Sequence, residues 1–278
     1  MPHTYVSVTL LKGTGALNID GTAFDTRLRQ VGEAIAQELD RFTTRTFQPQ
    51  VRVKTFPGDD TTLLLVDDLL KITSLKEDTN KDGTFETTWD ATDYILRPLN
   101  SDPTKDYGRP YTSIMVNPNS NGSQDIFLPG PQMYEIDGTW GYNAVTRDTS
   151  VKTSGSLGST ATTVAVNTSG VEPGMTVLID SEHLYIESTA AGGTSLTVAR
   201  GVNGSTAGTH ATTATIDRYV YPQPLVEASL IQVARLWKRK DSGFASQVGF
   251  PDTGVMVTFR GGLDSDVKQL VYPYKRLR

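Results

Sequence analysis

The stretch DTNKDGTF at residues 78–85 places oxygen-bearing side chains at the spacing of a calcium-binding loop. Asp78, Asn80 and Asp82 occupy positions 1, 3 and 5 of such a loop, and a glycine follows at position 6. A complete loop has a bidentate carboxylate at position 12, where this chain has Trp89. The flanking residues read as strands, and Asp-Gly between two strands favours a hairpin turn. The sequence therefore predicts a turn, with a bound ion as the alternative.

Histidine is the other residue type that would give this chain chemistry, and it occurs three times. His183 stands among acidic residues in DSEHLYIE, which suits a metal ligand or a general base. Strand alternation offers a simpler interpretation, in which His183 shares a face with Tyr185 while Glu182 points to the opposite face. His210 lies in a polar stretch and is expected to be solvated, and His3 lies near the N-terminus. Histidines scattered in this way predict no ligand cluster.

No pattern in the chain predicts a catalytic centre. The glycine-containing stretches RGVNG at 200–204 and GLDSD at 262–266 lack the Lys-Ser or Lys-Thr pair of a phosphate-binding loop. GSLGS at 155–159 has leucine where a nucleophile elbow has serine. Because nothing supplies a tuned base together with a nucleophile, we expect no enzymatic activity, no cofactor and no metal.

Composition excludes several classes of protein. Cysteine is absent, which excludes disulfides and thiolate metal sites. The longest apolar run, LLLV at 63–66, is far shorter than the ~20 residues of a membrane helix, so we expect no membrane partner. The N-terminus lacks the charged start and apolar stretch of a signal peptide. A net charge of −5 at pH 7 lacks the strong basic field of a general DNA binder.

Two segments carry the periodicity of amphipathic helices. In residues 22–45, apolar side chains recur every three or four positions from Phe24 to Phe42, and Thr22 is the expected N-cap. Residues 221–243 repeat this pattern, with Gly243 as the expected end of the helix.

A cluster of cations follows Trp237 at the end of the second helical segment. Lys238, Arg239 and Lys240 would complement the negative end of a helix dipole, which is the favoured interpretation. Contact with nucleic acid is the alternative.

The middle of the chain has the texture of β structure. In residues 50–142, β-branched and aromatic residues alternate with turn residues, which predicts a series of short strands. Residues 149–218 are rich in Thr, Ser and Gly, and four segments there, TTVAV, MTVLI, HLYIES and TSLTVA, read as strands. This composition predicts a self-contained all-β module.

Helices at both ends of the chain around a β block are typical of an insertion. We expect an α+β fold in which residues 1–148 and 219–278 form one discontinuous domain, a small α-helical bundle extended by β-hairpins or a β-sheet. Residues 149–218 would form an inserted all-β domain, a barrel or a sandwich. Residues near 30 should then lie close to residues near 235.

Five stretches, taken in order, resemble the head–tail connector proteins of tailed bacteriophages, also called adaptor or head-completion proteins. They are AIAQELDRFTTRTFQP at 34–49, DTNKDGTFETTWDATDYILRPLN at 78–100, EIDGTWGY at 135–142, PLVEASLIQVARLWKRKDSGFASQVG at 224–249 and LDSDVKQLVYPYKR at 263–276. Relatives pass almost directly from the W-G-Y strand to the Pro-led helix, whereas the β block intervenes here. That block resembles a small β module of various phage structural proteins.

The resemblance implies a structural virion protein without catalytic activity. Members of the family form a ring, commonly of twelve subunits, that docks beneath the portal and extends the DNA channel. The implied partners are the portal protein, further copies of this chain, and a downstream head-completion or stopper protein or a tail terminator. Genomic DNA would pass through the channel without sequence-specific binding. The implied location is the neck of the virion, after assembly in the cytoplasm of the bacterial host.

The C-terminal segment of the family commonly reaches the portal. Carried to this chain, that role falls on an aromatic and basic arm, whose candidate portal contacts are Tyr272, Tyr274, Lys275, Arg276 and Arg278. Tyrosine and arginine are both enriched at protein interfaces. An alternative reading of the whole chain is a capsid decoration or baseplate-type protein that binds a surface through its β domain.

Overall fold

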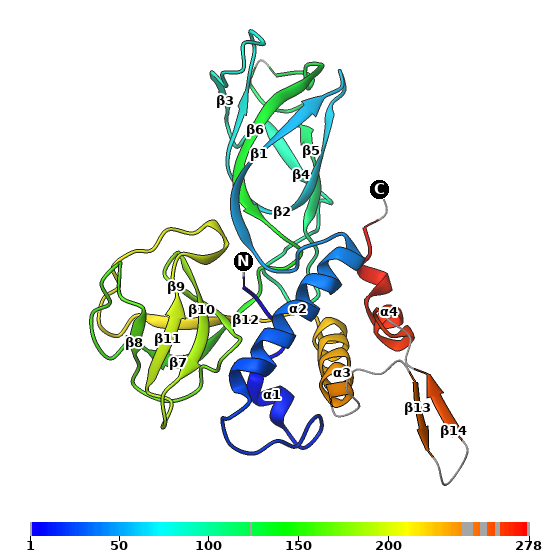
Figure 1. Ribbon diagram of the computed structural model, residues 1–278. Coiled ribbons are helices and arrows are strands. Elements are labelled where there is room, and N and C mark those ends of the chain that lie inside the picture. Colours follow the sequence, from blue (N-terminus) through cyan, green and yellow to red (C-terminus); the bar gives the residue numbers. More distant parts are fainter. Residues whose placement is uncertain (1, 123, 241–246, 251–254, 259–261, 277–278) are drawn as a thin grey trace. The chain divides into compact units, whose positions relative to one another are not determined.

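Figure 1 shows the computed structural model of the protein, which describes residues 2–122, 124–240, 247–250, 255–258 and 262–276. The chain divides into two compact units. The first unit comprises Met1–Arg45, Arg147–Val202 and Thr206–Arg278, and the second comprises Thr46–Thr146 and Asn203–Ser205.

The second unit is built on an antiparallel sheet of six strands in the order β1-β6-β2-β5-β4, with β3 paired to β2. The strands are β1 (Gln50–Gly58), β2 (Leu63–Glu77), β3 (Thr87–Trp89), β4 (Tyr94–Arg97), β5 (Tyr111–Val116) and β6 (Gly130–Trp140). The first half of β2 pairs with β5, and its second half pairs with β6. This one long strand therefore joins both halves of the sheet.

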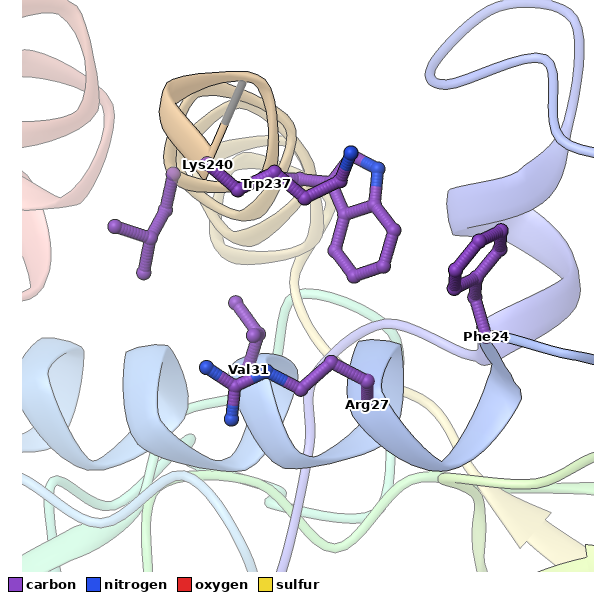
Figure 2. Close-up of a pocket in the computed structure, with 6 residues that line it drawn as sticks. Phe24, Arg27, Val31, Trp237 and Lys240 are labelled. Atoms are coloured by element: carbon purple, nitrogen blue, oxygen red, sulfur yellow. The ribbon is translucent and has the colours of Figure 1, made fainter. Parts of the chain in front are cut away.

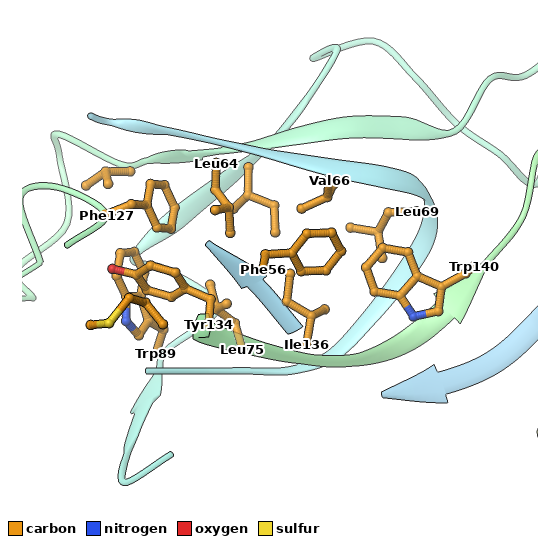
Figure 3. Packing of buried hydrophobic residues seen from close by; sticks show 13 residues of the cluster. Phe56, Leu64, Val66, Leu69, Leu75, Trp89, Phe127, Tyr134, Ile136 and Trp140 are labelled. Carbon is orange, nitrogen blue, oxygen red and sulfur yellow. The ribbon is translucent and has the colours of Figure 1, made fainter. Parts of the chain in front are cut away.

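The core of the second unit combines five aromatic side chains with aliphatic ones (Figure 3). Trp89 and Phe127 stack with their rings nearly parallel and their centroids 5.0 Å apart. Tyr134 meets both rings edge-on. The indole N–H of Trp89 donates to Glu77 Oε2 at 2.9 Å, and the Tyr134 hydroxyl donates to Glu77 Oε1 at 3.2 Å. A buried carboxylate thus satisfies the polar ends of two core rings.

A second antiparallel sheet, with strand order β7-β12-β9-β10-β11-β8, lies in the first unit. The strands are β7 (Thr146–Lys152), β8 (Thr163–Ala165), β9 (Thr176–Ile179), β10 (Glu182–Thr189), β11 (Ser195–Ala199) and β12 (Thr215–Tyr219), with the short 3-10 helix η1 (Val202–Gly204) before β12. The sheet closes on itself beyond its edge strands, because Ser154 N donates to Ala165 O and Asn167 N donates to Lys152 O. We call residues 147–219 the β block; all four strands expected in it are present.

The helices of the first unit come from both ends of the chain. They are α1 (Val8–Lys12), α2 (Asp25–Thr43), α3 (Gln223–Arg239), α4 (Ser265–Val271) and η3 (Tyr272–Tyr274). A two-stranded hairpin of β13 (Gln247–Phe250) and β14 (Val255–Thr258) stands between α3 and α4 in the sequence. Helix α3 contacts both α2 and α4. This packing confirms that residues near 30 lie close to residues near 235.

Helix α2 also shares a buried polar contact with the β block. The Tyr185 hydroxyl of β10 donates to Glu33 Oε1 at 2.8 Å, and Arg29 Nη1 pairs with the same carboxylate at 2.5 Å. Ahead of α1, Thr4 Oγ1 donates to the carbonyl oxygen of Gly174 at 2.8 Å. Burial raises the pKa of Tyr185, so this hydroxyl stays a neutral donor. The β block is therefore bonded to the N-terminal helices by specific contacts.

The expected fold class is wrong. The described residues hold two six-stranded antiparallel sheets and a few short helices, and no helical bundle is evident. The two long helices have strong periodicity and dominate the sequence pattern, whereas each short strand contributes a weak signal. Strands β7 and β12 run across the predicted boundaries at 148/149 and 218/219, and the division into domains stays a prediction.

The predicted ends of the helices also differ from the structure. The N-cap of α2 is Phe24, without a side-chain hydrogen bond, instead of Thr22. Helix α3 ends at Arg239 with Lys240 as its C-cap. Gly243, the expected end of this helix, lies outside the described residues.

Candidate functional site

The C-terminal residues expected to contact a portal form a segment that is anchored to helix α2. The segment begins with η3, directly after α4. The Arg276 N–H donates to the carbonyl oxygen of Thr43 at 2.9 Å, and Thr44 Oγ1 donates to the carbonyl oxygen of Arg276 at 3.0 Å. Two main-chain groups of one residue are thus bonded at the C-terminal end of α2, so the expected arm is fixed as far as residue 276.

The side chains of this segment present an aromatic and cationic surface. Tyr272 is 63% exposed. Lys275 is also exposed, and its ammonium lies 5.3 Å from the ring centroid of Phe42. Tyr274 and Arg276 are half-buried. The structure therefore brings together four of the five predicted contacts, and the fifth, Arg278, lies outside the described residues.

Salt bridges hold α4, and with it the C-terminal segment, against α3. The guanidinium of Arg235 pairs with Asp264 and with Asp266, each at 2.9 Å. Hydrogen bonds from Arg235 lower the pKa of Asp266, which keeps this carboxylate charged. Asp264 is the N-cap of α4, so Arg235 fixes the start of the helix that leads into η3.

A pocket of about 300 Å³ opens between α2 and α3 (Figure 2). We call it the α2/α3 pocket; its lining residues are Phe24, Arg27, Val31, Leu236, Trp237 and Lys240. Phe24 meets the Trp237 ring edge-on at 5.5 Å between centroids, and the Lys240 ammonium lies 5.1 Å from the Trp237 centroid. The pocket is therefore apolar inside and carries two cationic side chains, a surface suited to an aromatic group.

Sequence reasoning missed this pocket because it placed Phe24 in the buried stripe of α2. The Phe24 side chain is instead 48% exposed. Phe24 is the N-cap of α2 and lies outside its regular turns. The sequence placed the N-cap at Thr22, so it gave no signal that separates Phe24 from the stripe.

The DTNKDGTF stretch forms the connection between β2 and β3, which pair as a hairpin. The Asp78 carboxylate accepts hydrogen bonds from the N–H groups of Lys81 at 2.7 Å and Gly83 at 2.9 Å. Both of these residues have positive φ angles, so the chain turns sharply here. The flanking strands and this side-chain-capped turn agree with the predicted hairpin.

The same loop gathers three carboxylates. Ligand oxygens of Asp78, Asp82 and Glu86 lie within 4.8 Å of one another, the one such group in the described part of the chain. Asn80 Nδ2 donates to Glu86 Oε1 at 2.7 Å, and Thr84 N donates to Asp82 Oδ1 at 2.8 Å. Hydrogen bonds from Thr84 lower the pKa of Asp82. Carboxylates grouped in this way are suitable ligands for a cation. The expectation of a turn without a bound ion stays a prediction.

Glu182, at the start of β10, is the centre of a buried charged cluster in the β block. Arg200 donates to both carboxylate oxygens, each at 2.6 Å, and His210 Nε2 lies 2.7 Å from Oε2. The N–H groups of Gly201 and Gly208 add two hydrogen bonds of 3.0 Å. Burial opposes the charge of Glu182, but these donors outweigh it and lower its pKa to about 2.

The expectation that His210 is solvated is wrong, because its residue is only 5% exposed. Its Nδ1 lies 2.6 Å from Asp180 Oδ2, so both ring nitrogens face carboxylates. His183 is also buried, with its Nε2 2.9 Å from the hydroxyl of Tyr219, and burial lowers the pKa of His183 to about 4. Both histidines are therefore packed inside the β block and contact polar groups there.

No helix in the described part of the chain combines the length and apolarity that crossing a lipid bilayer requires. No protein-family model matches the chain, and neither the curated proteins nor the solved structures hold a match to it.

Proposed function

We propose that this chain is the subunit of a head–tail connector ring, which docks beneath the portal of a tailed phage and extends its DNA channel. The observation that carries the proposal is the grouping of three stretches that resemble this family. Residues 34–49, 224–249 and 263–276 contribute α2, α3 and α4, and α3 contacts both of the other helices in one compact unit. Stretches far apart in the sequence thus meet as the resemblance to a connector requires.

The C-terminal segment supports contact with the portal. Tyr272 and Lys275 are exposed, while the main chain of Arg276 is bonded to the end of α2. A surface that is held in place before binding loses less conformational entropy when a partner docks. The segment is therefore a prepared docking surface, with the portal as its partner.

The net charge of −5 suits a channel that lets DNA pass. Tight binding to the phosphate backbone needs clustered cations, because the gain comes from releasing counterions. The proposed ring would therefore let DNA slide past without gripping it.

The test mixes the purified chain with the portal protein encoded by the same phage, and follows the particles by native mass spectrometry and negative-stain imaging. We expect closed rings that cap the portal. The double variant Tyr272→Ala/Lys275→Ala should lose portal capture, whereas Lys268→Ala, an exposed cation on α4, should bind as the unaltered chain does.

Two outcomes would contradict parts of this proposal. Portal capture by the double variant at full strength would show that the C-terminal segment is not the docking surface. A chain that forms no ring, alone or with the portal, but coats intact heads at many sites would be a capsid decoration protein instead.

A further inference from the structure

A tyrosine in the second unit projects fully into solvent. Tyr107 lies in the loop between β4 and β5 and is 101% exposed. Its φ angle is +62°, in the left-handed region that residues other than glycine seldom adopt. A large apolar ring that is both exposed and held in an uncommon conformation calls for an explanation.

The loop around Tyr107 is built to keep this conformation. Lys105 N donates to the carbonyl oxygen of Asp102 at 3.2 Å, and Gly108 N donates to that of Lys105 at 2.9 Å. The Asp102 side chain accepts a further bond from Thr104 N at 3.0 Å. A Cβ on Gly108 would overlap the Asp102 carbonyl oxygen, so the turn requires glycine there. Tyr107 is therefore presented by a preformed turn.

The first unit holds a recess whose chemistry matches this tyrosine. The α2/α3 pocket offers the rings of Phe24 and Trp237, and its volume of about 300 Å³ accommodates one aromatic side chain. Its two cations, Arg27 and Lys240, suit the negative face of an aromatic ring and the carboxylate of Asp106, which precedes Tyr107.

We propose that Tyr107 of one copy inserts into the α2/α3 pocket of the next copy, and that this contact joins neighbouring subunits. The inference rests on the proposed connector function. Each copy carries both a projecting tyrosine and a matching pocket, so the contact joins two different surfaces. Such a head-to-tail contact generates a ring when the rotation between copies closes. Tyrosine, tryptophan and arginine are also the residue types that dominate binding energy at interfaces.

Cross-linking tests the contact directly, because the chain contains no cysteine and any introduced thiol is unique. One preparation carries Lys105→Cys and the other carries Gln30→Cys, exposed positions near Tyr107 and near Arg27 that keep the proposed charge pair. The two are mixed and treated with a short bis-maleimide. We expect a covalent dimer in the mixture and in neither preparation alone. Thr79→Cys, an exposed position on the β2–β3 loop of the same unit, replaces Lys105→Cys as the control and should give no dimer.

Substitutions test whether the tyrosine ring supplies the binding energy. Tyr107→Ala should raise the protein concentration at which half of the chains are assembled about tenfold or more, since truncation of a central aromatic anchor has effects of that size. Tyr107→Phe should assemble nearly as the unaltered chain does, because it keeps the ring.

The possible results separate this inference from the connector function. Rings that form without the crossed dimer, and that tolerate Tyr107→Ala, would overturn the contact and leave the ring standing. If both cysteines in one chain cross-link within a monomer, the pocket holds the tyrosine of its own chain, which also overturns the contact. A chain that does not self-associate, alone or with the portal, would overturn both proposals.

Discussion

The two six-stranded sheets of this protein reach the same size with different cores. The sheet of the second unit surrounds a cluster rich in aromatic rings, with Trp89, Phe127 and Tyr134 in mutual contact. The core cluster of the β block contains valine, leucine and isoleucine and no aromatic residue. Large rings concentrate much of the buried apolar area in a few side chains, whereas small aliphatic residues spread it over many.

Each sheet also buries one glutamate, and the two accept hydrogen bonds from different kinds of donor. Glu77 accepts hydrogen bonds from the neutral indole of Trp89 and the neutral phenol of Tyr134. Glu182 accepts them from the guanidinium of Arg200 and from His210. The difference teaches that the β block depends on paired charges, and that removing one partner there leaves another charge buried.

The largest expected effect comes from breaking the aromatic core. Phe127→Ala should destabilise the second unit by about 3–5 kcal/mol, because it removes a ring that contacts both Trp89 and Tyr134. The smaller deletion in the aliphatic core, Ile186→Val, removes one carbon and should cost the β block only about 0.5–1.5 kcal/mol. Amide hydrogen exchange, read strand by strand, separates the two units. Equal losses in both would contradict the contrast between the cores.

The next effect concerns the two buried glutamates. Glu182→Gln should cost about 3 kcal/mol, because the buried guanidinium of Arg200 loses the carboxylate that compensates its charge. Glu77→Gln should cost less, about 1–2 kcal/mol, since its partners are neutral donors. Amide hydrogen exchange in increasing urea measures the two losses. Strands β9 and β10 report on Glu182→Gln, and strands β2 and β3 report on Glu77→Gln. A larger loss for Glu77→Gln would refute the role given to charge pairing.

Acidification should weaken the β block before the second unit. The pKa of His183 is lowered from 6.5 to about 4, so the unfolded chain binds this proton first and stability falls as the pH drops from 6.5 toward 4. The loss should reach about 2 kcal/mol by pH 5. Glu182, with a pKa lowered from 4.5 to about 2, contributes stability that is lost between those two values.

The control for the acid effect is His183→Gln, which should remove the step between pH 6.5 and 4. The second unit contains no histidine and should keep its exchange protection over this range. If the second unit loses its exchange protection at a higher pH than the β block, the predicted order of acid sensitivity is wrong.

The smallest effect is expected in the β2–β3 loop. Asp82→Ala should change stability by less than about 0.5 kcal/mol, because this carboxylate is exposed and bonds only to its own loop. Addition of calcium should leave the thermal midpoint of the unaltered chain where it is. A midpoint that rises with calcium and returns with a chelator would establish an ion site at Asp78 and Asp82.

The sequence predicted the helices better than it predicted the fold class. A repeated apolar stripe identified α2 and α3 within a few residues, and their contact followed from the insertion pattern. The same stripe overstated the helical share, because it gives a long, regular signal while strands such as β3 and β8 are three residues long.

The buried charges of the β block could not be predicted from local pattern. On β10, Glu182 and Leu184 lie on one face and His183 and Tyr185 on the other, and all four are buried. Alternation separates buried from exposed residues only when one face meets water. Here Leu184 belongs to the core of the β block, while Tyr185 bonds to Glu33 of α2.

The role of His210 depends on partners far away in the sequence. Asp180 and Glu182 approach it only after β9, β10 and the stretch before β12 have folded together. The polar sequence around His210 therefore predicted exposure, although the folded chain buries this residue.

The bonds between Ser154 and Ala165 and between Asn167 and Lys152 join the two ends of the sheet in the β block. An unpaired strand edge can form backbone hydrogen bonds with an extended segment of another chain. Such pairing becomes more frequent when copies of the chain are held close together. In the proposed ring, each subunit would meet that hazard at both of its neighbours. In the β block, the backbone groups of Ser154, Ala165, Asn167 and Lys152 are already paired within the chain, so fewer edge groups remain to pair with a neighbouring copy.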